Sequence, residues 1–220
     1  MASKANNRPS GCYNDIFNSF LFKYVPASAV CLDVGCWTGN LGAALIRQKR
    51  CVVDGIDYKA DVLKMARQQG YRSTYKVDLN NDRYNLSIIK GKYDAIICGD
   101  VLEHLISPQL LLDKLTLFLK PNGIFIISVP NIAFILYRVK LLLGYWDYES
   151  SGVMDKTHLR FFTLKTLRSI LRDSGLTVNQ CLPYNLVREK FWFLHLLGKF
   201  FPSLFSLQFL VIAHKARRTS

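Results

Sequence analysis

The order of short apolar segments along the chain constrains its fold more than any other feature. Runs rich in β-branched and apolar residues alternate with stretches whose apolar positions follow helical spacing. This alternation is typical of a parallel sheet whose strands are joined by crossover helices. The predicted strands are Val30–Val34, Cys51–Ile56, Ser73–Val77, Tyr93–Cys98, Gly123–Val129, Leu176–Leu182 and Ser206–Ala213. The predicted helices are Asp15–Lys23, Asn40–Gln48, Lys59–Gln69, Pro108–Leu119, Leu164–Ser174 and Phe191–Phe201.

These segments predict an α/β fold with a doubly wound, mostly parallel seven-stranded sheet and helices on both faces. The last two strands are separated by a single helix, so we expect them to form an antiparallel edge. Residues 131–163 depart from the alternation and are interpreted as an insertion after the fifth strand. The length of 220 residues fits one domain over residues 12–220, preceded by a flexible polar tail over residues 1–11.

The charge of the chain favours an anionic partner. Lys and Arg number 29 against 16 Asp and Glu, which gives a net charge of +13. The excess is uneven, because residues 131–220 carry 13 basic and 5 acidic side chains. Half of the residues are apolar, which excludes a disordered chain. The charge by itself does not separate nucleic acid, a lipid surface and a phosphorylated small molecule.

Cysteine usage and apolar segments bear on the compartment. The six cysteines form no C-x-x-C pair and no cluster with zinc spacing, so we expect free thiols and a cytoplasmic protein. The N-terminal residues lack the apolar core of a signal peptide. The apolar stretch from Phe191 to Ala213 is interrupted by Lys199 and Pro202, so no transmembrane helix is predicted.

A glycine turn follows the first predicted strand and opens the next helix. Gly35 and Gly39 would let backbone approach a ligand closely, since a Cβ would collide there. The spacing is D-x-G-x-x-x-G, with Trp37 where a dinucleotide-binding motif has its second glycine. Asp33 adds a carboxylate that would repel a pyrophosphate and attract an ammonium or sulfonium group. A glycine turn alone is also compatible with a purely structural role.

Four further motifs follow in order. Asp57 closes the second strand, where a carboxylate can accept both hydroxyls of a ribose. Asp78-Leu79 follows the third strand, Tyr93–His104 covers the fourth strand and the turn after it, and Leu119–Gly123 forms a Pro-Asn-Gly turn. Together with the glycine turn, these motifs over residues 28–131 resemble class I S-adenosylmethionine (SAM)-dependent methyltransferases. Trp37 is the departure from the pattern of that family.

The resemblance implies an enzyme whose cofactor is SAM. A narrower resemblance comes from Ser128–Asn131 and Asp155–Thr163, which are similar to methyltransferases of bacterial glycan clusters and to the related ubiquinone-biosynthesis O-methyltransferases. The residues expected to bind the cofactor are Asp33, Gly35, Cys36, Gly39, Asp57, Tyr58, Asp78, Leu79 and Asp100.

Two histidines are the candidates for removing a proton from a hydroxyl acceptor, because the ordinary pKa of histidine is the nearest to neutral pH. His104 follows the fourth strand, and His158 lies late in the insertion. Either could instead be a structural anchor. Glu103 is interpreted as an orienting group, a solvated carboxylate or a metal ligand, since some related ubiquinone-pathway enzymes need a divalent ion. Arg160 would hold a substrate anion or pair with an aspartate. No metal site is predicted.

The first half of the insertion, residues 132–146, is apolar apart from Arg138 and Lys140. A helix that is apolar nearly all round must bury against something. We expect a lid over the substrate site, with membrane contact and a dimer face as alternatives. At about 18 Å for twelve residues, such a helix is too short to span a bilayer.

The sequence favours O-methylation of a small molecule such as a sugar, a glycolipid or a quinone-type precursor. The basic C-terminal part suits an acceptor that is phosphorylated, nucleotide-linked or lipid-borne, and also a peripheral contact at the inner membrane face. An RNA methyltransferase acting on ribose or a ring carbon is the alternative. Methylation of a base amine is disfavoured, because Gly99–Leu102 lacks a proline and a stacking aromatic residue. A binding protein without activity remains a third hypothesis, while the glycine spacing opposes a nicotinamide oxidoreductase.

Overall fold

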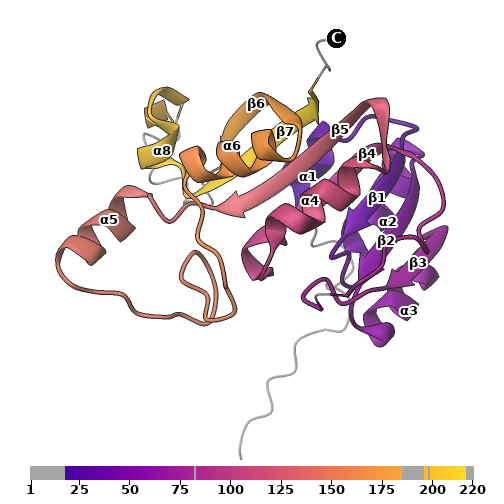
Figure 1. Cartoon of the computed structure of the whole chain (residues 1–220), viewed down its shortest axis with the longest axis horizontal. Helices are drawn as coiled ribbons and strands as arrows, with labels where there is room; N and C mark the ends of the chain where they lie inside the picture. Colours follow the sequence, from indigo (N-terminus) through magenta and orange to yellow (C-terminus); the bar gives the residue numbers. More distant parts are fainter. Residues whose placement is uncertain (1–17, 82, 185–195, 198, 217–220) are drawn as a thin grey trace, which may run out of the picture.

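The computed structural model describes residues 18–81, 83–184, 196–197 and 199–216. The predicted tail over residues 1–11 lies outside these residues, as do parts of the predicted helices Asp15–Lys23 and Phe191–Phe201. The chain forms a seven-stranded sheet in the order β3-β2-β1-β4-β5-β7-β6 (Figure 1). The strands are β1 (Val30–Val34), β2 (Val52–Asp57), β3 (Ser73–Lys76), β4 (Tyr93–Gly99), β5 (Leu119–Pro130), β6 (Leu176–Tyr184) and β7 (Gln208–Lys215).

Strand directions match the predicted fold. The first five strands pair in parallel, whereas β7 is antiparallel to both β5 and β6, which confirms the expected antiparallel edge. The strand order reverses between β1 and β4. In a doubly wound sheet this reversal opens a crevice at the carboxyl ends of the strands, where ligands bind.

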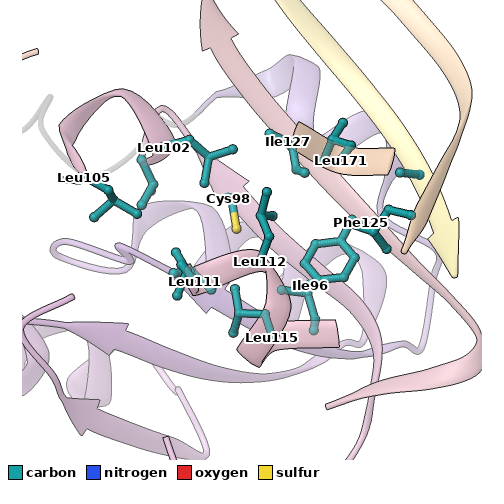
Figure 2. Close-up of a cluster of buried hydrophobic side chains, with 14 of the residues drawn as sticks. Ile96, Cys98, Leu102, Leu105, Leu111, Leu112, Leu115, Phe125, Ile127 and Leu171 are labelled. Carbon is teal, nitrogen blue, oxygen red and sulfur yellow. The ribbon is translucent and has the colours of Figure 1, made fainter. Parts of the chain in front are cut away.

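Helices cover both faces of the sheet. The helices of the described residues are α1 (Ser19–Tyr24), α2 (Asn40–Lys49), α3 (Ala60–Gln68), α4 (Pro108–Thr116), α5 (Ile135–Leu142), which lies away from the sheet (Figure 1), α6 (Leu164–Asp173) and α8 (Pro202–Phe205), with a 3-10 turn η1 (Leu102–His104) after β4. Successive side chains of β4 point to opposite faces, as the period of two requires. Ile96 and Cys98 pack under Leu112 of α4 (Figure 2), while Ala95 and Ile97 belong to the core cluster under α1, α2 and α3. Burial of β4 on both faces explains its continuous apolar run.

The predicted Pro-Asn-Gly turn lies inside the long strand β5. Tyr93 pairs with Leu119, and the next pair joins Ala95 to Ile124, so four residues of β5 lie opposite a single residue of β4 and the register shifts there. Helix α4 correspondingly ends at Thr116, earlier than the periodicity predicts, because the chain must already turn back toward the sheet.

The insertion leaves the sheet after β5 and extends away from it, with α5 at its far part (Figure 1). Asn131 anchors its start, because the buried amide donates to the carbonyls of Ser203 and Ser206. Ala133 and Phe134 at the start of the insertion are buried, whereas helix α5 contains no buried residue, and the role of residues 132–146 as a lid stays a prediction. Among the described residues, no helix is long and apolar enough to cross a membrane.

Candidate active site

A cavity of about 480 Å³ lies at the carboxyl ends of β1, β2, β3 and β4. This is the edge at which the strand order reverses, and the volume lies in the range of small-molecule sites. Seven of the predicted site residues line it: Gly35, Asp57, Tyr58, Asp78, Leu79, Asp100 and His104. Seven others complete the wall: Trp37, Val77, Asn80, Val101, Leu105, Thr157 and Leu159.

The charge of the cavity is opposite in sign to that of the chain. Asp57, Asp78 and Asp100 contribute three carboxyl groups, and none of the described residues that line the cavity is Lys or Arg. A ligand that carries a sulfonium and an ammonium group therefore meets a complementary wall, whereas a pyrophosphate would be repelled.

Gly35 is the glycine that brings backbone to the cavity. Its φ is +69°, and a Cβ at this position would lie 2.7 Å from Cγ2 of Val101. The turn is held in place by the N–H of Gly35, which donates to the carbonyl of Ile56 at 2.8 Å. A side chain would have to displace Val101, which itself lines the cavity, so the cradle requires glycine here.

Two backbone N–H groups orient the carboxylate of Asp57, one from the glycine turn and one from the residue that precedes α3. Its Oδ2 accepts from the N–H of Trp37 at 3.0 Å, and its Oδ1 accepts from the N–H of Lys59 at 3.0 Å. Each carboxylate oxygen can accept a further hydrogen bond, so the pair of ribose hydroxyls still has acceptors. Trp37, with a φ of +48°, leaves its indole exposed at the cavity wall, where the ammonium of Lys59 lies 4.8 Å from the ring centroid.

Three predicted cofactor-binding residues do not line the cavity. Asp33 is buried and accepts a hydrogen bond from the hydroxyl of Tyr71 at 2.6 Å, and burial raises the pKa of Asp33 to about 7. Cys36 is buried against Gly55. A Cβ on Gly39 would meet the backbone of Ala66 at 2.8 Å. These residues therefore support the turn from behind instead of facing the cavity.

Asp100 is held by side chains and backbone of β5 and β7. Its N–H donates to the carbonyl of Ser128 at 3.1 Å and fixes the residue at a φ of +54°. Its Oδ1 accepts from Oγ of Ser128 at 2.9 Å and from the amide of Gln208. Desolvation raises the pKa of Asp100. The two hydrogen bonds to Oδ1 act in the opposite direction, but their effect is smaller. Both bonds use Oδ1, so Oδ2 remains for a ligand in the cavity.

The two predicted catalytic histidines lie together, with ring centroids 4.8 Å apart. The hydroxyl of Thr157 donates to Asp155, so toward His104 it can only accept, as can the carbonyl of Thr157 at 3.2 Å. Nδ1 of His104 therefore carries the proton. Nδ1 of His158 likewise faces the carbonyl of Val153 at 3.0 Å. In the neutral form of each ring the lone pair is then on Nε2, which is what a general base requires.

Glu103 lies beside this histidine pair and is almost fully buried. Its Oε2 has no hydrogen-bond partner among the described residues, and burial together with Asp100 raises its pKa well above the usual range. Its carbonyl accepts from the N–H groups of Leu159 and Arg160, which ties the end of the insertion to η1. Ligand atoms of Glu103, His104 and His158 lie within 4.8 Å of one another, so these residues could hold a divalent cation.

The residues missed by the sequence reasoning come mainly from loops. Asn80 follows the predicted Asp78-Leu79 motif directly, and its side chain donates to the carbonyl of His104 at 2.9 Å and accepts from the N–H of Ile106 at 2.8 Å. The Asp-x-Asn spacing after a strand was a usable signal.

Arg160 forms no ion pair with an aspartate among the residues that the structure describes. Its guanidinium donates to the carbonyl of Ile106, at the wall of a second cavity.

Residues 9–180 match the family described as methyltransferase domain. The chain belongs to this family. The match to the family covers more than half of the sequence and includes every residue that lines the cavity. The predicted methyltransferase class is therefore confirmed, as is the Rossmann-like fold.

Relatives of this methyltransferase-domain chain include named enzymes. It is 34% identical over 132 residues to a ubiquinone biosynthesis O-methyltransferase of Xylella fastidiosa strain 9a5c, over 56% of this chain and 51% of the relative. The chain thus spans about half the length of that protein. It is 28% identical over 205 residues to the enzyme of the same name from Haemophilus ducreyi strain 35000HP, over 84% of each.

Solved structures share the fold at low identity. A SAM-dependent methyltransferase of Methanosarcina mazei is 17% identical with a TM-score of 0.64, over 92% of this chain and 99% of that one. Magnesium protoporphyrin IX methyltransferase of Synechocystis PCC 6803 with bound SAM is 18% identical with a TM-score of 0.55, over 90% and 76%. The acid-lined cavity with its Gly35 cradle fits the SAM that the Synechocystis enzyme binds.

Proposed function

We propose that this chain transfers the methyl group of SAM to an oxygen of a small molecule. The observation that carries the proposal is a single cavity that joins an acid-lined cradle to His104, against which His158 packs. Bound SAM supplies a methyl group that is already a strong electrophile. The protein then has to align the acceptor and remove its proton.

The lining residues divide into two groups under this proposal. Asp57, at the end of β2, accepts the ribose hydroxyls, while Asp78 and Leu79, just after β3, border the adenine side. Asp100 faces the methionine part with its free carboxyl oxygen, close to the histidines. His104 lines the cavity and is positioned to take the proton of the acceptor through Nε2, and His158 packs against it as the partner that receives or orients that proton.

The acceptor class follows from the relatives and from the charge. The relatives are named for ubiquinone biosynthesis, which supports a hydroxyl on a quinone-type precursor, with a sugar or glycolipid hydroxyl as the next candidates. The 13 basic residues after residue 130 favour an acceptor that is phosphorylated, nucleotide-linked or lipid-borne. Ribose or ring-carbon methylation of RNA is the competing function, and it predicts nucleic-acid binding that falls steeply with salt.

Cofactor binding provides the direct test. Isothermal titration with SAM and with S-adenosylhomocysteine should give dissociation constants in the micromolar range. A folded protein that binds neither would refute the proposal. Incubation of a cell extract with the protein and methyl-labelled SAM, followed by mass spectrometry, would then identify the acceptor by its added methyl group.

Replacing Asp57 with alanine should weaken SAM binding by about 1–3 kcal/mol, because hydrogen bonds to a charged group are lost. The matched control is Asp61→Ala, since Asp61 is exposed in the first turn of α3, outside the cavity wall. Titration of both variants should show a loss only for Asp57→Ala. Equal affinities for SAM would remove Asp57 from the cofactor site.

We further propose a cytoplasmic protein that contacts the anionic face of a membrane through α5 and the residues that follow it. Leu142 and Leu143 are 85% and 66% exposed, and Tyr145 and Trp146 continue the apolar surface. Exposed apolar side chains on a chain whose net charge is +13 are typical of proteins that contact an anionic membrane surface. No buried residue in α5 competes with such a contact.

Vesicle sedimentation tests the membrane contact. Phosphatidylglycerol vesicles should retain the protein and phosphatidylcholine vesicles should not. Leu142→Glu should abolish retention, whereas Leu117→Glu, at a 65% exposed residue just after α4, should have no effect. Retention that survives Leu142→Glu would refute the proposal, as would a dimer in light scattering that this variant dissociates, since the surface would then face a second copy.

A further inference from the structure

Tyr71 lies just after α3, outside the cavity and outside every motif of the sequence. The residue is buried. Its hydroxyl donates to Oδ2 of Asp33 at 2.6 Å and accepts from the N–H of Gly42 at 3.1 Å. Asp33 lies in β1 and Gly42 in the first turn of α2, so one hydroxyl connects the two elements between which the glycine turn runs.

The bond to Gly42 replaces a missing helix cap. The first amides of a helix have no partner within it, and a side chain at the N-cap normally accepts from the third of them. The N-cap of α2 is Gly39, which makes no side-chain cap bond. Gly42 is the third residue of α2, and the hydroxyl of Tyr71 accepts from its N–H in place of the cap.

The ring of Tyr71 also accounts for glycines that do not face the cavity. A Cβ on Gly39 or on Gly55 would come within 2.9 Å of a ring carbon. A Cβ on Gly42 would come within 2.2 Å of the ring and of the hydroxyl. Three glycines from the turn, α2 and β2 thus leave the space that this one aromatic ring fills.

We propose that Tyr71 is a positioning residue that holds the Gly35–Gly39 turn in the geometry that binds SAM. The inference rests on the proposed function, because it assigns to Tyr71 an effect on the affinity for the cofactor. Tyr71 acts through Asp33, Gly42 and the packed glycines, without touching the ligand. Gln69, two residues before Tyr71, supports the same turn near its end, since its side-chain amide donates to the carbonyl of Thr38 at 2.9 Å.

The test compares Tyr71→Phe with Tyr93→Phe. Tyr93 is also buried, and its hydroxyl also donates to a buried carboxylate, Asp54, at 2.8 Å, but the residue lies outside the cavity wall. Both variants lose one hydroxyl and keep the ring. Titration with S-adenosylhomocysteine should show about tenfold weaker binding for Tyr71→Phe and a change below about twofold for Tyr93→Phe.

Hydrogen exchange without any ligand gives an independent readout. The amide of Gly42 should exchange faster in Tyr71→Phe than in the wild type, and it should be unchanged in Tyr93→Phe. Wild-type affinity and exchange in Tyr71→Phe would overturn the proposal, as would an equal loss in both variants. A wild-type protein that does not bind S-adenosylhomocysteine would refute the proposed function instead, while the exchange comparison would still test Tyr71.

Two Asp33 variants test the other end of the bridge. Asp33→Asn keeps an oxygen that can accept from Tyr71, so binding of S-adenosylhomocysteine should stay within about twofold of the wild type. Asp33→Ala removes the acceptor and should resemble Tyr71→Phe. A large loss of S-adenosylhomocysteine binding in Asp33→Asn would mean that the charge of Asp33 contacts the ligand directly. This result would overturn the positioning role of the bridge.

Discussion

Replacing His158 with alanine is expected to lower the rate of methyl transfer by about 10²- to 10⁴-fold, the usual contribution of general acid–base catalysis, because His158 receives or orients the proton that His104 takes. The affinity for SAM should remain within about twofold, because His158 does not line the cavity. The rate can be followed as label passing from SAM to the acceptor that the extract experiment identifies, and the affinity by titration. An unchanged rate would remove His158 from the mechanism.

The pair of histidines allows a sharper version of this experiment. If His104 and His158 act as one proton-transfer unit, His104→Ala should cost a similar factor, and the double variant should be little worse than either single variant. His214→Ala is the control, because His214 lies at the far end of β7 and outside the cavity wall. Additive losses from the two single variants would show that the histidines act separately.

Replacing Gly39 with alanine is expected to destabilise the fold by about 2–5 kcal/mol. A residue with a Cβ at a φ of +88° is strained by about 1–2 kcal/mol, and overpacking adds about 1–3 kcal/mol. The added Cβ would lie 2.8 Å from Cα of Ala66, a backbone atom of α3 that has no rotamer to change. Helix α2 would have to move away from α3.

Thermal unfolding measures this effect against a control with the same strain. Gly152 has a φ of +89°, and a Cβ there would meet nothing within 4 Å. Gly152→Ala should therefore show the cost of strain alone. At about 2–4 °C per kcal/mol for a chain of this size, Gly39→Ala should lower Tm by about 5–15 °C, and Gly152→Ala by only a few degrees. Equal shifts would show that Gly39 is needed only for its backbone conformation.

Much of the fold could be predicted because burial leaves a regular trace in the sequence. Strand β1 has its predicted bounds, and the other strands begin within a few residues of theirs. A strand buried on both faces must be apolar throughout, and a crossover helix must be apolar on one side, so both patterns are local. The bulge in β5 was not predicted, since pairing register depends on the neighbouring strand.

The cavity residues that close strands were predictable for the same reason. Asp57, Asp78 and Asp100 each end or follow a predicted strand, and the carboxyl ends of parallel strands meet at one edge. Thr157 and Leu159 were not found, because they reach the cavity only when the insertion folds back and the N–H of Leu159 bonds to the carbonyl of Glu103. No periodic pattern marks such a loop.

The sequence by itself determined the family, the order of strands and helices and the set of polar groups at the edge of the sheet, because each of these depends on neighbouring residues and on periodicity. Only the tertiary structure decided which side of the glycine turn each residue faces. Gly35 faces the cavity, while Asp33 and Gly39 face Tyr71 and α3. That choice depends on backbone dihedrals and on a tyrosine more than thirty residues away, which local spacing does not encode.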